Sequence, residues 1–227
     1  MTVTLGINGF GRIGRLVLRA AYEQGRRDIT FVAINDLGTI EDNAYLLRYD
    51  TVHGPFPGTI KTTKTGINVG HGTIAVFAER NPTRLPWGRL GIDVVLECTG
   101  IFTKRENADE HLAAGARRVL ISAPASGEDL TVVFGVNDHK LRKKHLVVSN
   151  ASCTTNCLGP VASVLHKAIG IRQGYMTTIH AYTSDQRIVD TLHADKRRAR
   201  AAAMSMIPTS TGAARAVGLV LPELKGR

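Results

Sequence analysis

The sequence is poor in cysteine, in aromatic residues and in acidic residues. Three cysteines among 227 residues cannot form a fully paired disulfide framework, which favours a reducing compartment. No window reaches the ~18 apolar residues that a membrane-spanning helix needs, and the first residues lack the basic and apolar segments of a secretory signal. We therefore expect a cytoplasmic protein with no membrane partner.

The shortage of acidic residues leaves a formal net charge of +10. The basic residues are scattered in short groups, and aromatics make up only 5% of the chain, so the pattern typical of single-strand binders is missing. We therefore do not expect a nucleic-acid partner, since anion sites for small phosphorylated molecules suit this charge equally well. The basic patch at Lys196–Arg200 keeps a non-catalytic nucleotide- or RNA-binding module as an alternative.

What the sequence does contain is an alternation of strand and helix patterns over its first ~150 residues. Val3–Asn8 reads as a strand, residues 13–24 carry apolar side chains at helical spacing, and residues 30–35 form a near-continuous apolar run. Further elements are expected as helices at 40–49 and 107–114, hairpin strands within 58–77, and strands at 93–98, 118–122, 131–135 and 146–150. This order predicts a doubly wound parallel α/β sheet.

After Asn150 the pattern changes. A helix is expected to run towards Ile169, a strand at 175–180, and a basic, alanine-rich segment at 194–206. Pro160 predicts that the helix either begins near Gly159 or is kinked there. We place the domain boundary between residues 151 and 152.

A complete G-x-G-x-x-G motif, Gly9 to Gly14, lies between the first strand and the first helix. Gly9 permits the tight turn, Gly11 lets backbone approach a pyrophosphate, and Gly14 allows close packing of helix and strand. A glycine-rich turn without a ligand is the alternative. Asp36, about 20 residues further on, argues against it, because its carboxylate can accept both ribose hydroxyls and would repel the 2′-phosphate of NADP. We therefore expect NAD rather than NADP, with further contacts where later strands end, at Thr99, Gly100 and Ser122.

The stretch S-N-A-S-C-T-T-N-C, Ser149 to Cys157, allows a metal clasp, a buried pair or one reactive thiol. The remaining cysteine, Cys98, lies in a predicted strand, so too few ligands are present for zinc and we expect no metal. Cys153 falls at the start of a helical segment, where a thiol pKa is lowered, and is the candidate nucleophile. His180 is the best candidate base, although a surface or capping histidine is the alternative.

Six segments together resemble phosphorylating glyceraldehyde-3-phosphate dehydrogenases: N-G-F-G-R-I-G-R, A-I-N-D, S-N-A-S-C-T-T-N-C, T-T-I-H-A-Y-T, R-R-A-R-A-A and I-P-T-S-T-G-A-A. The resemblance covers the whole chain in order. It implies a glycolytic oxidoreductase that converts glyceraldehyde 3-phosphate, NAD and inorganic phosphate to 1,3-bisphosphoglycerate through a cysteine thioester, as a homotetramer. Erythrose-4-phosphate dehydrogenase is the alternative, and Y-T-x-D at 182–185 favours the glyceraldehyde enzyme.

The resemblance also implies residue roles and a domain plan. Cys153 attacks the aldehyde, and His180 activates the thiol and serves as acid and base. The NAD contacts implied are Arg12, Ile13, Asp36, Arg80 and Ser122. The substrate and phosphate contacts implied are Ser152, Thr154, Thr183, Asp185, Arg198, Thr211 and Gly212. We thus expect a Rossmann-type NAD-binding domain at 1–151, followed by an incomplete α+β catalytic domain at 152–227.

We expect the catalytic domain to be incomplete because of where the sequence ends. It stops at Arg227, whereas the family continues with an arginine for the substrate phosphate, an asparagine for the nicotinamide, more sheet and a C-terminal helix. We expect a fragment or a truncated reading frame in which catalysis would be impaired. Thr191-Leu192 also replaces the Leu-Pro pair of strictly NAD-using relatives, which leaves dual cofactor use open.

Overall fold

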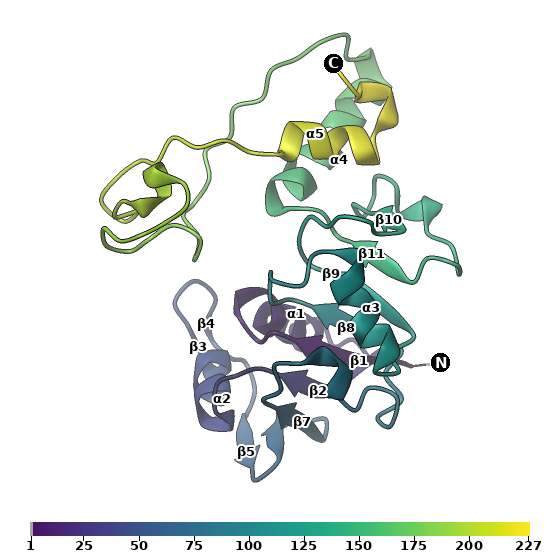
Figure 1. The fold of residues 1–227 in the computed structure, drawn as a ribbon, viewed down its shortest axis with the longest axis vertical. Coiled ribbons are helices and arrows are strands. Elements are labelled where there is room, and N and C mark those ends of the chain that lie inside the picture. The colour runs from purple at the N-terminus through teal and green to yellow at the C-terminus, as the bar shows by residue number, and fades with distance from the viewer. Residues whose placement is uncertain (1) are drawn as a thin grey trace. The chain divides into compact units, whose positions relative to one another are not determined.

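A computed structural model describes residues 2–227 and divides the chain into two compact units (Figure 1). The first unit ends at Ser152, and the second is Cys153–Arg227. The first is mixed α/β and the second is helical with long irregular segments. Within the described residues, no helix is long and apolar enough to cross a membrane.

Nine strands of the first unit form one sheet, in the order β10-β11-β9-β8-β1-β2-β7-β6-β5 across the described part of the chain. Neighbours from β10 to β7 run parallel, and β7, β6 and β5 form an antiparallel edge. The strands are β1 Val3–Asn8, β2 Ile29–Asn35, β5 Lys61–Thr63, β6 Gly66–Asn68, β7 Thr73–Phe77, β8 Val94–Glu97, β9 Arg118–Ile121, β10 Leu130–Thr131 and β11 Val147–Ser149. A separate hairpin pairs β3 Tyr49–Asp50 with β4 Gly54–Pro55.

The direction of winding reverses at β1. The chain proceeds from β1 to β2 and β7 on one side, and then to β8, β9 and β11 on the other. In open α/β sheets, ligands bind at the carboxyl ends of the strands where the order reverses. The predicted doubly wound α/β sheet is therefore confirmed, and its switch point lies between β1 and β8.

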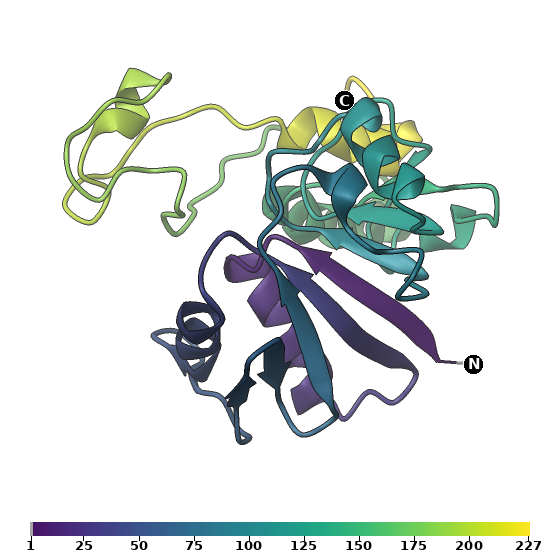
Figure 2. The same cartoon turned by 60° about the horizontal axis from the view of Figure 1, so that its bottom comes forward.

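Helices and loops cover the sheet because its buried strands are apolar on both faces. Helix α1, Arg12–Glu23, lies against the sheet (Figure 2). Its Leu18 packs in one cluster with Ile7 of β1 and Ile34 of β2. The neighbouring residues Ala33 and Val95 belong to a different cluster, which contains the buried Trp87. The other helices of this unit are α2, Ile40–Arg48, and α3, Arg105–Ala113.

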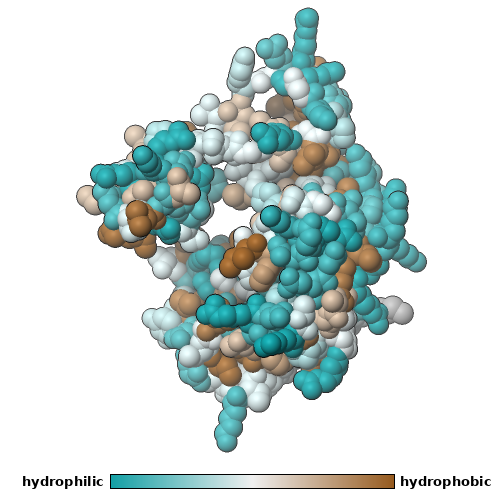
Figure 3. Space-filling view, in the orientation of Figure 1, coloured by the Kyte–Doolittle hydropathy of each residue, from teal (hydrophilic) through white to brown (hydrophobic). Residues whose placement is uncertain are grey.

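The second unit contains helix α4, Cys153–Ile169, and helix α5, Ala213–Val220, which pack on each other. Two short 3-10 turns, Lys196–Ala199 and Pro222–Leu224, complete its regular structure within the described residues. Hydrophobic side chains reach the surface of the chain in several places (Figure 3). In this unit Ile179 and Met206 are almost fully exposed.

Two predictions about local structure were wrong. Residues 175–180 form no strand, because the described part of the second unit offers no other strand to pair with. The strand expected at 131–135 ends at Thr131. The Val133 N–H donates to Oδ1 of Asn137 at 2.8 Å and is therefore not available for pairing with a strand. Of the two alternatives that Pro160 left open, a helix start near Gly159 is excluded, because helix α4 begins at Cys153, as expected for the segment that carries this thiol, and contains Pro160.

Candidate active site

The turn after β1 is shaped by close backbone contacts. Gly9 has φ of +89°, and a Cβ there would lie 2.7 Å from the backbone nitrogen of Thr99 at the end of β8. A Cβ on Gly14 would lie 2.3 Å from the carbonyl oxygen of Gly9. A Cβ on Gly11, in contrast, would meet nothing within 4 Å. The turn is thus packed tightly at Gly9 and Gly14 and open at Gly11, where a pyrophosphate is expected to approach.

The structure brings Asp36 to this glycine turn. One carboxylate oxygen accepts the Phe10 N–H at 2.8 Å, and the other accepts the Gly38 N–H at 2.9 Å. A carboxylate offers about four acceptor sites, so capacity remains for two ribose hydroxyls. The residues present therefore fit the adenosine half of a dinucleotide.

The other predicted cofactor residues surround the same edge of the sheet. Arg12 and Ile13 lie exposed in the first turn of α1, and Arg12 forms an ion pair with Asp50. The Asp50 side chain is only 7% exposed and also accepts two backbone N–H groups from the following turn. Thr99 and Gly100 follow β8, Ser122 follows β9, and Arg80 lies exposed after β7.

Sequence reasoning missed three polar side chains that are buried beneath this edge: Asn8, Asn35 and Glu97. Each is the last residue of a central strand, β1, β2 or β8. A polar residue at the end of an otherwise apolar strand was the available signal, since burying it requires hydrogen-bond partners.

In the second unit, Cys153 and His180 face each other. The Sγ atom lies 3.2 Å from Nε2 of His180, and the Thr154 hydroxyl lies 4.0 Å from the same sulfur. Nδ1 of His180 is 2.6 Å from the Ala181 carbonyl, which can only accept, so Nδ1 carries the proton and Nε2 faces the thiol. Helix α4 begins at Cys153, so the positive end of its dipole also favours a thiolate.

These contacts shift both ionisation equilibria. Partial burial opposes ionisation of the thiol, but hydrogen bonds from His180 and Thr154 and the charge of His180 outweigh it and lower the pKa of Cys153. The carbonyl of Ala181 and the bond to Cys153 raise the pKa of His180. The two groups titrate as a pair, which is the arrangement of an activated cysteine nucleophile.

The thiol of Cys98 has a pKa shifted in the direction opposite to that of Cys153. Burial raises the pKa of this thiol to about 11, despite a hydrogen bond with Ser122. Its thiolate is therefore scarcely populated at neutral pH, and we assign Cys98 a packing role. All three cysteines are free thiols, and Cys157 lies exposed on α4.

The predicted phosphate contacts form local groups within the second unit. Arg198 forms an ion pair with Asp185, and its Nε donates to the Thr209 hydroxyl at 3.1 Å. Partial burial works against ionisation of Asp185, but the hydrogen bond and charge of Arg198 outweigh it and lower the pKa of that carboxyl. The Asp185 N–H lies 3.4 Å from the Thr183 hydroxyl. Asp185 therefore holds the Arg198 side chain in place, and its own negative charge would repel a phosphate.

The remaining predicted contacts lie at helix starts. Gly212 is the N-cap residue of α5, and the Thr211 hydroxyl accepts the Ala213 N–H at 3.2 Å. Ser152 directly precedes α4 and is half-buried. Hydroxyl and backbone N–H groups at helix starts are suitable ligands for an anion.

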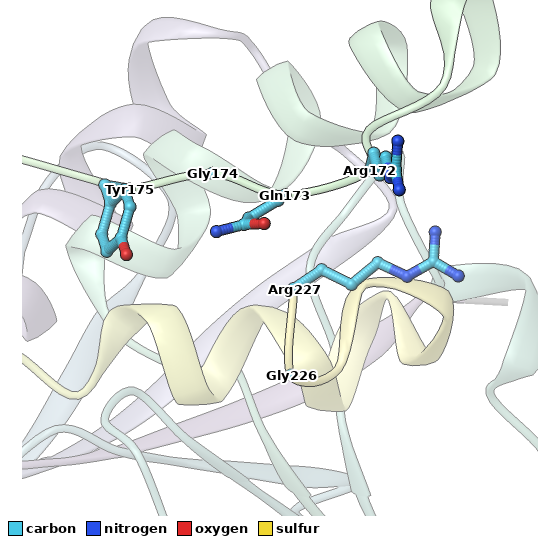
Figure 4. Close-up of a pocket in the computed structure, with 6 residues that line it drawn as sticks. All are labelled: Arg172, Gln173, Gly174, Tyr175, Gly226 and Arg227. Carbon is cyan, nitrogen blue, oxygen red and sulfur yellow. The ribbon is translucent and has the colours of Figure 1, made fainter.

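A hollow of the second unit lies elsewhere. It has a volume of about 300 Å³ and is bordered by Arg172, Gln173, Gly174, Tyr175, Gly226 and Arg227 (Figure 4). None of these is a predicted site residue, so the hollow is not the candidate site. Among residues 2–227, no group of three or more His, Cys, Asp or Glu side chains could hold a metal ion.

The doubly wound sheet and its glycine turn define the class: a Rossmann-type dinucleotide-binding protein. Family models then match in order, "Glyceraldehyde 3-phosphate dehydrogenase, NAD binding domain" over residues 3–105 and "Glyceraldehyde 3-phosphate dehydrogenase, C-terminal domain" over residues 152–227. The chain is 67% identical over 227 residues to the glyceraldehyde-3-phosphate dehydrogenase of Xanthobacter flavus, covering all of this chain and 68% of the relative. It is 64% identical to that of Cereibacter sphaeroides and 60% identical to that of Pseudomonas aeruginosa, with the same coverage. The chain belongs to the glyceraldehyde-3-phosphate dehydrogenase family.

Proposed function

We propose that this chain is an NAD-dependent glyceraldehyde-3-phosphate dehydrogenase that forms 1,3-bisphosphoglycerate. The observation that carries the proposal is the pairing of Cys153 with His180 at the start of α4, at 3.2 Å and with a lowered thiol pKa. The match to relatives of that name, over all of this chain and 68% of each relative, supports the substrate.

The chemistry begins with proton transfer. Nε2 of His180 takes the proton of the Cys153 thiol, and the thiolate attacks the aldehyde carbon to form a thiohemiacetal. The protonated imidazole then lies within reach of the developing oxyanion, which it stabilises. A bound NAD would supply the hydride acceptor for the thiohemiacetal carbon, and His180 would take the proton of the thiohemiacetal hydroxyl as the thioester forms. Inorganic phosphate finally attacks the cysteine thioester and releases the acyl phosphate and the Cys153 thiolate.

We assign the cofactor to the first unit. The open position at Gly11 and the carboxylate of Asp36 fit the pyrophosphate and the adenosine ribose. A 2′-phosphate would meet the negative charge of Asp36, which favours NAD over NADP. The proposed contacts further along the edge are Arg12, Ile13, Arg80, Thr99, Gly100 and Ser122.

We assign both phosphates to the second unit. Arg198, held by Asp185, supplies the charge-assisted donor, and Thr183 lies next to that pair. Thr154, Thr211 and Gly212 supply hydroxyls and N–H groups at the starts of α4 and α5. Ser152, which directly precedes α4, keeps its predicted role as a phosphate contact. Such anion sites orient the aldehyde relative to the thiol, which lowers the barrier by several kcal/mol.

We extend the proposal to the finer features that the family resemblance implies. They are a homotetramer and a cytoplasmic location, where a reactive thiol such as Cys153 stays reduced. Analytical ultracentrifugation of the purified chain tests the tetramer, and a sedimenting monomer would contradict it.

The test is the appearance of NADH absorbance with the full chain, NAD, phosphate and glyceraldehyde 3-phosphate. We expect turnover that requires phosphate and disappears after iodoacetamide treatment. Erythrose 4-phosphate in a parallel reaction is expected to give a lower kcat/KM. Turnover that survives alkylation would overturn the role of Cys153, and a higher kcat/KM for erythrose 4-phosphate would overturn the substrate.

A further inference from the structure

We propose that Glu97 is a positioning residue of the NAD site, which locks together the two chain turns at the switch point of the sheet. The inference rests on the proposed binding of NAD by the first unit. It concerns a buried polar network that the proposed reaction does not use: Asn8, Asn35, Trp87, Glu97 and His111.

Hydrogen bonds converge on Glu97 from both turns. Oε1 accepts the N–H of Thr99 at 2.8 Å and also the Thr99 hydroxyl. Oε2 accepts from Nδ2 of Asn8 at 2.5 Å and lies 3.0 Å from Nε2 of His111. The side chain is 1% exposed, so these contacts replace solvent.

The direction of the bond from His111 is set by a tryptophan. Nε1–H of Trp87 can only donate, and it donates to Nδ1 of His111 at 3.0 Å. Nδ1 is therefore the acceptor, and the proton of the neutral ring is on Nε2, which points at Glu97. Trp87 and His111 are completely buried, so water does not compete for either nitrogen.

The direction of the bond from Asn8 is set by a backbone amide. The N–H of Glu79 donates to Oδ1 of Asn35 at 2.8 Å, so Nδ2 of Asn35 faces Oδ1 of Asn8 at 2.7 Å. Asn8 must then present its own Nδ2 to Glu97. Every hydrogen-bond partner of Glu97 is a donor, and residues other than Glu97 fix the donor orientation of Asn8 and His111. A carboxylate can only accept, so it is the one side-chain group that satisfies all of these donors.

Two residues that donate to Glu97 lie next to the turns where NAD is expected to bind. Asn8 immediately precedes the glycine turn, and Thr99 follows β8. Between them Gly9 approaches Thr99 so closely that a Cβ would lie 2.7 Å from the Thr99 nitrogen. Glu97 thus holds both turns together at the edge where the cofactor backbone contacts are expected, without touching the cofactor itself.

Glu97→Gln is the decisive variant because it preserves shape and removes acceptors. The amide NH₂ would face donors from Asn8 or Thr99, and one turn would shift to escape the conflict. We expect the Kd for NAD to rise at least about tenfold, measured by calorimetry, and the KM for NAD to rise while kcat stays within about twofold.

Ile92→Ala is the matched control. Ile92 is completely buried and packs in the cluster that contains Trp87. Its apolar side chain cannot bond to the network, and its backbone N–H donates to the Trp87 carbonyl at 3.0 Å, a bond that alanine keeps. We expect it to lower the melting temperature and to leave the Kd for NAD unchanged at temperatures where the chain is folded. The emission of Trp87, the single tryptophan, monitors folding in every sample.

Two histidine variants keep the proposal testable if Glu97→Gln does not fold. His111→Gln can still accept from Trp87 and donate to Glu97, so NAD affinity should stay within about twofold. His111→Leu removes the donor and should weaken NAD binding by about threefold or more. Wild-type affinity in Glu97→Gln or in His111→Leu, or equal weakening by Ile92→Ala, would overturn the role of Glu97. Failure of the wild-type chain to bind NAD would instead overturn the proposed function, and this inference with it.

Discussion

The two units of this chain hold their functional residues in place by different kinds of packing. The first buries large apolar side chains such as Ile7, Ile34 and Trp87 within a continuous sheet, and its turns are packed backbone to backbone. The second buries mainly small or medium side chains, including Ala162, Val217 and Val220, between two helices. Residues 171–195 and 200–212 between those helices contain no helix or strand.

The difference concerns what keeps each functional group in place. In the first unit, the cofactor turn is restrained by steric contacts and by a buried network of hydrogen bonds. In the second, Cys153 and His180 are joined by one contact between a helix start and an irregular segment. The first site is therefore held by many backbone and buried side-chain contacts, whereas the thiol pair of the second is held by a single side-chain contact.

The largest effect is expected from removing the nucleophile. Cys153→Ala should lower kcat by at least about a thousandfold, since covalent catalysis has no substitute group. NAD affinity of the first unit should stay within about twofold. Cys157→Ala is the control, because this exposed thiol lies one turn further along α4 and has no hydrogen bond to His180 or the predicted phosphate residues within residues 2–227. Equal loss in both variants would show that the helix, and not the thiol, had been damaged.

A pair of glycine variants separates folding from cofactor binding in the first unit. Gly9→Ala should destabilise it by about 2–5 kcal/mol, because alanine is strained at positive φ and its Cβ meets the Thr99 backbone. Gly11→Ala should cost at most about 1 kcal/mol, since its Cβ enters open space.

The same pair should differ in NAD binding. Because the open space at Gly11 is where the pyrophosphate is expected, Gly11→Ala should raise the Kd for NAD about tenfold or more in a folded chain. Urea unfolding and calorimetry measure the two quantities. Unchanged NAD affinity in Gly11→Ala would remove the pyrophosphate from this turn.

The pH dependence of thiol alkylation tests the coupling in the second unit. His180 lowers the pKa of Cys153, so the wild-type thiol should reach half-maximal reactivity with iodoacetamide below the pH of an ordinary cysteine. His180→Asn removes that partner, so the midpoint should move to higher pH. His166→Asn, at the other end of α4, serves as the control and should leave the midpoint in place. An unshifted midpoint in His180→Asn would contradict the pairing.

The smallest perturbation is a brief digestion with trypsin, which compares the rates at which the two units are cleaved. Sites within residues 171–211, such as Arg172 and Arg187, should be cut about tenfold faster than Arg105 or Arg118 of the first unit. Mass spectrometry of the first fragments identifies the sites. Initial cleavage within the first unit would reverse the comparison of the two units.

Much of the first unit could be predicted from local pattern. The strand at Val3–Asn8 was predicted with its observed limits, and the motif from Gly9 to Gly14 indicated both the turn and its ligand class. The strand predicted at 175–180 failed although its residues are β-prone. A strand exists only with a partner, and partners are set by the rest of the fold.

The sequence by itself determined the family, the apolar periodicity of the sheet and the residue types of the thiol pair, because these depend on neighbours along the chain. Only the tertiary structure decided which side chains meet. It placed Gly9 against Thr99, Asp36 against the Phe10 N–H, and Glu97 among its donors. The contacts of Gly9 with Thr99, of Phe10 with Asp36 and of Asn8 with Glu97 join residues 26 to 90 positions apart. Their energies come from distance and burial, which no local pattern encodes.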